Sequence, residues 1–249
     1  FILSKITCYA GRVMKFIPVK TKIMEPPQED LYSVLDASVP ELKNGDIVCI
    51  SSKVVAIHQG RTVRISEADK AELVKREADH LIHADYHPFP LTIKFNTFLG
   101  AAGIDESNGN GYYILPPERV FETAAELHGY FKKRHNITDI GVIITDSRSL
   151  PFRFGAMGVA IACWGFSPIA SHVGKKDLFG REIKYERSNL ADAVAAAANL
   201  VSGEVAECQP VVIARGVPEV VFGDGDRSAD LIVKPEEDIF RILYERFLK

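Results

Sequence analysis

The sequence has few of the features that mark disulfide-stapled, membrane-spanning or nucleic-acid-binding proteins. It contains four cysteines in 249 residues, and Cys49 and Cys163 stand inside apolar runs, so we expect reduced core thiols rather than a disulfide framework or a zinc site. No apolar run reaches about 18 residues and no signal-peptide pattern is visible, so we expect no membrane span and a cytoplasmic protein. Lys and Arg total 30 against 33 Asp and Glu, so the net charge is −3 and the composition does not indicate a surface that binds nucleic acid.

Three histidines, His80, His83 and His87, have helix-like spacing of a kind that can bind a metal ion. Pro88 and Pro90 close this segment, however. We therefore interpret it as the end of a surface helix rather than a metal site.

Length and composition are ordinary for a globular protein, because 47% of the residues are hydrophobic and 25% are charged. We expect residues 1–249 to form one domain, with two intimately packed subdomains as the alternative. Apolar periodicity predicts strands within 2–18 and at 47–50, 91–95, 112–115, 142–144 and 210–214. It predicts helices at 29–37, 67–83, about 117–134, 188–203 with Ser188 as its cap, and 234–249.

The central candidate residue is Asp146. It follows the buried strand 142–144 at the point where the chain turns polar, and Arg148 and Arg153 bring two fixed positive charges near it. A carboxylate with nearby cations suits a site for phosphate and a divalent cation. The alternative is that Asp146 only forms a turn or caps the strand.

Ser51, Ser52 and Lys53 stand at the end of the predicted strand 47–50, before the apolar residues 54–57. Hydroxyls and an ammonium group at a strand end can hold phosphate oxygens. The segment lacks the glycines of a Walker loop, and a solvated turn remains the alternative.

A third polar cluster surrounds Asp105 and Asn108, after the small residues Ala101, Ala102 and Gly103. Asp105 offers hard oxygen ligands for Mg²⁺ or Mn²⁺, and Asn108 could contact a nucleotide. An Asx-rich turn before the strand 112–115 is the other interpretation.

Two glutamates, Glu204 and Glu207, follow the alanine-rich helix that ends near Gly203. One of them could complete a metal site, since an acidic group at a helix C-terminus opposes the helix dipole and needs an explanation. The basic loop 174–181 could anchor an anionic substrate or could be a solvated turn.

Five co-linear motifs together resemble the coenzyme F420-0:L-glutamate ligase family, also called gamma-glutamyl ligases. The similarity covers most of residues 15–225. The motifs occupy residues 45–61, 102–108, 145–153, 177–182 and 210–216.

The resemblance implies an α+β fold specific to this family, with mixed and antiparallel sheets and packed helices, in an intertwined homodimer. It also implies an enzyme that forms an amide bond between L-glutamate and a small carboxylate-bearing acceptor, with GTP, or ATP, as co-substrate and Mg²⁺ or Mn²⁺ as cofactor. Position by position, it implies metal ligands at Asp105, Asp146, Ser147 and Glu204 or Glu207. It implies nucleotide contacts at Ser51, Ser52, Lys53 and Asn108.

The residue chemistry fits the same reaction. A carboxylate can be activated by phosphoryl transfer to an acyl phosphate, which an amine then attacks. Asp146 would act at the metal, and Lys53 and Arg153 would offset developing charge.

The sequence departs from the family at three places. Residues 20–23 replace a Gly-Leu-Pro loop, Ser149-Leu150 replaces Gly-Arg, and Gly155-Ala156 replaces Gly-Gln. The acceptor could therefore be the deazaflavin precursor of coenzyme F420 or a pterin such as dihydropteroate or folate. A non-catalytic nucleotide-binding protein and a metal-dependent phosphatase are the alternatives from other classes.

Overall fold

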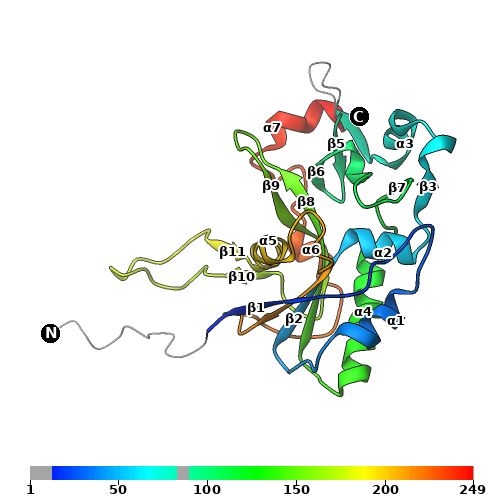
Figure 1. Cartoon of the computed structure of the whole chain (residues 1–249). Helices are drawn as coiled ribbons and strands as arrows, with labels where there is room; N and C mark the ends of the chain where they lie inside the picture. Colours follow the sequence, from blue (N-terminus) through cyan, green and yellow to red (C-terminus); the bar gives the residue numbers. More distant parts are fainter. Residues whose placement is uncertain (1–12, 83–89, 249) are drawn as a thin grey trace.

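The computed structural model describes residues 13–82 and 90–248, which form a mixed α+β structure (Figure 1). A five-stranded main sheet lies at its centre. β2 and β8 run parallel in this sheet, and its other neighbouring strands are antiparallel. In spatial order the strands are β1 (Lys15–Val19), β12 (Val211–Arg215), β2 (Asp46–Ser51), β8 (Ile140–Ser149) and β9 (Ala156–Trp164).

Helices cover both faces of the main sheet (Figure 1). Because side chains alternate along a strand, Ile47 and Cys49 of β2 are buried on the α5 face, whereas Val48 and Ile50 are buried on the opposite face. The apolar runs at 47–50 and 142–144 are thus buried on both sides, as their lack of polar residues predicts. The covering helices are α5 (Leu190–Ser202) on one face, and α1 (Leu31–Ser38), α2 (Ser52–His58) and α4 (Val120–His135) on the other.

A smaller part of the chain packs beside β8 through the neighbouring strand β6 (Figure 1). Its apolar cluster includes Leu73, Val74, Ala102 and Tyr113, and is separate from the two clusters of the main sheet. Its elements are β3 (Thr62–Arg64), α3 (Lys70–Glu77), β4 (His80–Ile82), β5 (Leu91–Lys94), β6 (Thr97–Gly100), a 3₁₀ turn (Ala101–Gly103) and β7 (Tyr112–Ile114).

The remaining elements lie at the edges of the described structure. β10 (Ile169–Ser171) and β11 (Arg187–Asn189) pair to form the base of an arm that projects away from the main sheet (Figure 1). α6 (Ser228–Leu231) and α7 (Arg241–Tyr244) are single turns near the end of the chain. None of the helices in 13–82 and 90–248 is long and apolar enough to cross a membrane.

Close packing fixes α5 against β9. A Cβ atom on Gly158 of β9 would overlap the backbone oxygen of Ala195 and lie 2.6 Å from Cβ of Asn199. At the start of the helix, Asp192 accepts a hydrogen bond of 2.9 Å from the backbone N–H of Ala160. Asn189 caps this helix, so the prediction of Ser188 was wrong by one residue, whereas the predicted stop at Gly203 is confirmed.

Most predicted strands and helices are confirmed, but the helix expected at 67–83 is wrong at both ends, since α3 spans Lys70–Glu77. Ala78 is extended, and His80–Ile82 pair with Leu91–Ile93 as a hairpin. Asp79 stabilises this hairpin by accepting hydrogen bonds from the backbone of Phe95 and the ammonium group of Lys94. His83 and His87 lie outside the described residues, as do residues 2–12 of the predicted opening segment.

Three further differences concern the site and the end of the chain. α2 was not predicted, because its residues 54–57 are all apolar and show no helical periodicity. β8 continues to Ser149 instead of ending at Ile144, although burial does fall from Thr145 onward. The single helix expected at 234–249 is wrong, since Ile239 and Ile242 are exposed and only short turns form there.

Among the described residues, three cysteines are free thiols, as expected: Cys49, Cys163 and Cys208. Burial raises the pKa of the Cys163 thiol to about 12, which keeps it protonated at neutral pH. Both Cys49 and Cys163 contribute to the apolar cluster between the main sheet and α5. They are therefore core residues rather than reactive groups.

Gly158→Ala should destabilise the protein, because the added methyl group has no room between β9 and α5. We expect the free energy of unfolding to fall by about 1–3 kcal/mol in urea titrations. Gly129→Ala is the matched control, since Gly129 lies in α4 with open space at its Cβ position, and there alanine should raise stability by about 0.5–1 kcal/mol. Equal effects of the two substitutions would contradict the close packing of α5.

Candidate functional site

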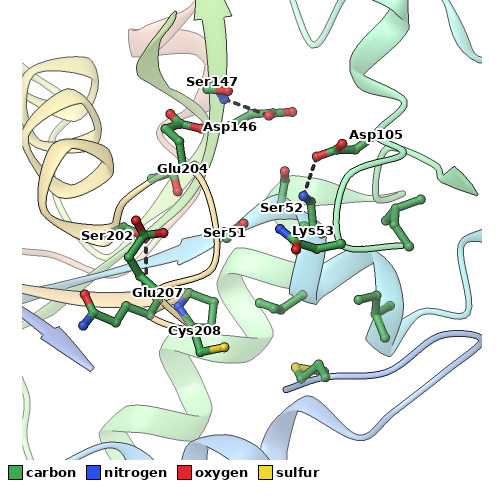
Figure 2. A pocket seen from close by; sticks show the side chains of 18 of the residues that line it. Ser51, Ser52, Lys53, Asp105, Asp146, Ser147, Ser202, Glu204, Glu207 and Cys208 are labelled. Carbon is green, nitrogen blue, oxygen red and sulfur yellow. Dashed lines mark hydrogen bonds and ion pairs between the residues drawn. The ribbon is translucent and has the colours of Figure 1, made fainter. Parts of the chain in front are cut away.

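A cavity of about 560 Å³ opens at the carboxyl ends of β2 and β8 (Figure 2). Its wall is made of the ends of β2 and β8 with α2, the loop at 103–110, residues 114–117, the end of α5 with the loop at 203–209, and residues 21–24. The parallel register pairs Ser51 with Thr145, so both strands reach the same edge of the sheet. The polar residues after each strand therefore meet in one place.

Lys53 is directed at Asp105 in this cavity (Figure 2). Its Nζ atom lies 2.5 Å from Oδ2 of Asp105 and 3.1 Å from the backbone oxygen of Ser107. The Ser107 hydroxyl and N–H both donate to Oδ1 of Asp105. Both carboxylate oxygens of Asp105 therefore have a partner: Lys53 for Oδ2 and Ser107 for Oδ1.

The loop that carries Asp105 has an unusual backbone that places it near Asp146. Ala101, Ala102 and Asn108 have positive φ angles of 50°, 55° and 56°, which short loops with tight turns require. At Gly103, an added Cβ atom would lie 3.4 Å from Oδ2 of Asp146. The 3₁₀ turn therefore brings its backbone directly against the Asp146 carboxylate.

Asp146 lies on the face of β8 that is turned toward α2 and Asp105. It follows Val142 and Ile144 in the strand alternation, and both of these are buried on that face. Its carboxylate accepts hydrogen bonds from the Ser147 backbone N–H at 2.8 Å and from the Ser52 hydroxyl. Asp146 thus has hydrogen-bond partners, but no lysine or arginine forms an ion pair with it in the described structure.

The two aspartates have opposite electrostatic environments. Burial raises the pKa of Asp146 to about 6, and the neighbouring charge of Asp105 adds to this effect. Burial also disfavours ionisation of Asp105, but the ion pair with Lys53 and the hydrogen bonds from Ser107 outweigh it, so the pKa of Asp105 is lowered. The cavity is lined by more carboxylates than ammonium groups, since Asp105, Asp146, Glu204 and Glu207 stand against Lys22 and Lys53.

The other predicted ligands, Ser147, Glu204 and Glu207, also line the cavity, but none of them converges with both aspartates in the described structure. Ser147 faces α5, because its partner Gly158 packs against Ala195. Glu204 comes from the loop after α5 (Figure 2), and Glu207 accepts a hydrogen bond of 2.9 Å from the backbone N–H of Val205 in the same loop. In 13–82 and 90–248, no three His, Cys, Asp or Glu side chains converge closely enough to hold a metal ion.

Asn108 joins the two loops on either side of the cavity. Its side-chain amide donates to the backbone oxygen of Val205 at 2.7 Å. It therefore lines the cavity and holds the loop at 203–209 in place.

Arg153 does not reach the cavity. It lies at the tip of the β8–β9 hairpin beside Phe152 and Phe154, which are fully exposed. The predicted strand end at Ile144 placed this arginine too close to Asp146, because the hairpin extends further than the apolar pattern indicated.

Sequence reasoning missed Ser107 as a partner of Asp105, and it connected residues 20–23 with the nucleotide site through the family resemblance alone; residues 21–24 are part of the cavity wall. The spacing Asp-x-Ser is typical of a local turn and could have indicated the first of these. The position of residues 21–24 results from the backbone N–H of Thr21 donating to the oxygen of Cys208, a contact that no local pattern indicates.

Comparison with known proteins supports the resemblance. The F420-0:Gamma-glutamyl ligase family matches residues 18–216, a range that includes every residue lining the cavity. Coenzyme F420:L-glutamate ligase of Methanopyrus kandleri is 34% identical over 245 residues, which cover 90% of this chain and 96% of that protein. The protein of the same name from Methanocaldococcus jannaschii is 33% identical over 248 aligned residues, with 92% of this chain and 98% of that protein covered. The one from Archaeoglobus fulgidus is 30% identical over 259 aligned residues, with 94% of this chain and 99% of that protein covered.

Asp146→Asn should stabilise the metal-free protein at pH 7 and have little effect near pH 4. Below the ordinary pKa of 3.8 the carboxyl is protonated in both the folded and the unfolded chain. Between pH 4 and about 6 the Asp146 carboxyl ionises in the unfolded chain but stays protonated in the folded one, so the free energy of unfolding of the wild-type protein falls. The amide of Asp146→Asn does not titrate, so the variant shows no such fall. A pKa difference of about 2 corresponds to roughly 3 kcal/mol in the free energy of unfolding.

Urea unfolding at both pH values, with a chelator present, measures this difference. Asp105→Asn is the control of opposite sign, because the pKa of Asp105 is lowered and its ionised form stabilises the folded state at pH 7. If Asp146→Asn changes the free energy of unfolding by the same amount at pH 4 and pH 7, the raised pKa of Asp146 is contradicted.

Proposed function

The chain belongs to the F420-0:Gamma-glutamyl ligase family, and on this premise we propose that it is a nucleotide- and divalent-metal-dependent ligase that joins L-glutamate to a carboxylate-bearing acceptor. The observation that carries the proposal is the meeting of Asp105, Asp146 and Lys53 in one cavity. Two carboxylates and an ammonium group suit a nucleotide triphosphate and a bridging cation. Since the relatives are named coenzyme F420:L-glutamate ligases, the proposed acceptor is the deazaflavin precursor F420-0.

The proposed ligands of Mg²⁺ or Mn²⁺ are Asp105 and Asp146. Mg²⁺ commonly takes one or two protein carboxylates and completes its shell with phosphate oxygens and water, so the absence of a third converging carboxylate fits this use. A raised pKa beside a second carboxylate also marks a group whose ionised form a cation would stabilise. When bound, the metal would neutralise charge on the nucleotide's phosphates.

Ser147, Glu204 and Glu207 remain proposed as additional ligands. Ser147 faces α5, while the two glutamates belong to the loop at 203–209. Neither glutamate converges with Asp105 and Asp146 in the described structure, so a three-carboxylate site would need the loop to rearrange. Glu207 would also have to release the N–H of Val205.

The proposed nucleotide contacts are Ser51, Ser52, Lys53 and Asn108, all of which line the cavity. The serine hydroxyls can donate to phosphate oxygens, and Lys53 supplies a flexible charge that can move from Asp105 to a phosphate. GTP is the proposed co-substrate, with ATP as the alternative.

The proposed reaction has two steps. An oxygen of the acceptor carboxylate attacks the γ-phosphorus, the bond to the β-phosphate oxygen breaks, and an acyl phosphate and a nucleoside diphosphate form. The amine of L-glutamate then attacks the acyl carbon, inorganic phosphate leaves with the electrons of the C–O bond, and the nitrogen loses a proton to give the amide. Lys53 offsets negative charge on the phosphoryl oxygens during the first step.

A pterin acceptor such as dihydropteroate or folate is the second candidate for the same chemistry. Thr21, Lys22 and Ile23 line the cavity where the resembling family has Gly-Leu-Pro. A different wall of the cavity can change which acceptor fits, while Asp105 and Asp146 keep their roles.

A homodimer is proposed because large apolar side chains are left uncovered on two projecting elements. Phe152 and Phe154 on the β8–β9 hairpin are fully exposed, and Leu178, Phe179 and Tyr185 on the arm between β10 and β11 are at least 84% exposed. Clustered exposed apolar groups are typical of interaction sites. A second copy that covers the hairpin could also bring Arg153 to the site of the other copy.

The test of the function is mass spectrometry of products after incubation with GTP or ATP, Mn²⁺, L-glutamate and one acceptor at a time. We expect a glutamyl mass increment on F420-0; an increment on dihydropteroate instead would identify the pterin as the acceptor. Asp146→Asn should abolish the product while the protein stays folded. If no acceptor gains mass and the nucleotide binds without divalent metal, the ligase proposal is wrong and a non-catalytic binding protein is favoured.

The test of the dimer is light scattering during gel filtration. We expect twice the chain mass of 27.5 kDa for the wild-type protein, and monomers for the double variant Phe152→Ser/Phe154→Ser. Ile239→Ser is the control, because Ile239 is 85% exposed and lies outside the hairpin and the arm. A wild-type monomer at micromolar concentration would overturn the dimer.

A further inference from the structure

The ammonium group of Lys53 uses all of its hydrogen-bond donors in the described structure (Figure 2). An ammonium has three N–H donors and no acceptor. The Nζ atom lies 2.5 Å from Oδ2 of Asp105, 3.1 Å from the backbone oxygen of Ser107 and 3.3 Å from the Ser107 hydroxyl oxygen. Because three oxygens match three donors, Lys53 must release at least one of them before it can bind a phosphate oxygen.

The Asp105 oxygen that Lys53 contacts is the one that is left for a divalent cation. Mg²⁺ and Mn²⁺ prefer hard oxygen ligands such as carboxylates. Oδ1 of Asp105 already accepts two hydrogen bonds from Ser107, at 2.9 Å from its N–H and at 2.7 Å from its hydroxyl. Oδ2 has no hydrogen bond from Ser107, but it holds the ammonium group of Lys53.

A metal ion and Lys53 exclude each other at this oxygen. Mg²⁺ binds a carboxylate oxygen at about 2.0–2.1 Å, so it would lie within a few ångströms of Nζ, where two positive charges repel each other. Both side chains line the cavity, and the exposed fractions are 25% for Lys53 and 39% for Asp105. Solvent and ligands therefore reach the ion pair, and the flexible stem of Lys53 allows its ammonium to move away.

We propose that Lys53 occupies the cation position at Asp105 until a nucleotide binds, so that metal and nucleotide bind as a coupled pair; this inference rests on the function proposed above. In the ligand-free protein the ammonium balances the charge of Asp105. Lys53 then moves from Oδ2 to a phosphate oxygen, which frees Oδ2 for the cation. Each ligand thus removes the contact that opposes the other, and by linkage the gain in affinity is the same in both directions.

Lys53→Met should bind Mn²⁺ more tightly than the wild-type protein when no nucleotide is present, because the competing ammonium is gone. We expect the Kd of Mn²⁺ to fall about 10-fold, as for the loss of a charged hydrogen bond that is partly exposed. Electron paramagnetic resonance of free Mn²⁺ measures this binding without turnover. A residue that only supports the site would have the opposite effect, since its loss weakens metal binding.

Lys22→Met is the matched control for Mn²⁺ binding. Lys22 also lines the cavity, but it pairs with Glu29 instead of Asp105. Its removal tests whether any lost positive charge favours the cation, and we expect the Kd of Mn²⁺ to change by less than about twofold because solvent and salt screen exposed charges. Equal gains for Lys22→Met and Lys53→Met, or no gain for Lys53→Met, would overturn the proposal.

Nucleotide binding gives the reciprocal test. Asp105→Asn weakens the hold on Lys53, so with a chelator present this variant should bind GTP about 10-fold more tightly than the wild-type protein in calorimetric titrations. Glu204→Gln is the control, because it removes a negative charge from the same cavity and Glu204 forms no ion pair with Lys53 in the described structure. Equal gains for the two variants would show a general effect of charge and would contradict the proposal.

Failure of this inference and failure of the proposed function give different results. Neither titration uses the acceptor, glutamate or turnover, so both remain valid if the wild-type protein forms no glutamyl product. If the wild-type protein binds Mn²⁺ and GTP together but the variants show no gain, only the role of Lys53 is wrong. If Lys53→Met does not fold, as circular dichroism would show, the comparison of Asp105→Asn with Glu204→Gln decides the question.

Discussion

The parallel register between β2 and β8 is the constraint on which the site depends. It pairs Asp46 with Ile140 at one end and Ser51 with Thr145 at the other, so both strands finish at the same edge. A slip of one residue would turn every side chain of β8 to the opposite face and place Ser147 where Asp146 lies. Both faces of the two strands are apolar, so steric fit rather than polarity opposes this slip: a Cβ atom at Gly141 of β8 would lie 2.7 Å from Cδ1 of Phe166 and 3.0 Å from Cγ1 of Ile47. Close packing of the core thus determines which carboxylate faces the cavity.

Charge in the cavity is distributed unevenly. Asp105 takes the ion pair with Lys53 and two hydrogen bonds from Ser107, whereas Asp146 takes only hydrogen bonds and is more buried by its surroundings. Such an arrangement lowers the stability of the folded chain when no ligand is bound. It is typical of sites where a cation or substrate supplies the missing charge, because a balanced site would have less affinity for that ligand.

Local sequence patterns predicted the parts of this site better than their assembly. Polar residues after the apolar runs identified Ser51, Lys53 and Asp146 separately, and family resemblance connected them with Asp105. The helix predicted over 67–83 failed because pairing of 80–82 with 91–93 depends on contacts beyond the local window. α2 was missed because a helix buried on most sides has no periodicity to detect. The capping of α5 by Asn189 rather than Ser188 is a difference of one residue, within the usual uncertainty of helix ends.

The β8–β9 pairing determines where the two arginines that follow Asp146 in the sequence, Arg148 and Arg153, are placed. Pairing continues to Ser149 and Ala156, and β9 is held in turn by the close contact of Gly158 with α5. If the ladder stopped at Thr145, Arg148 and Arg153 would share one loop beside the carboxylate. Because it continues, Arg148 stays on the Asp146 face of a rigid strand while Arg153 is carried to an exposed tip. A rigid strand positions a charge more accurately than a loop does, so Arg148 keeps a fixed place against Thr97 of β6, whereas Arg153 is exposed and better suited to contact with a second protein surface.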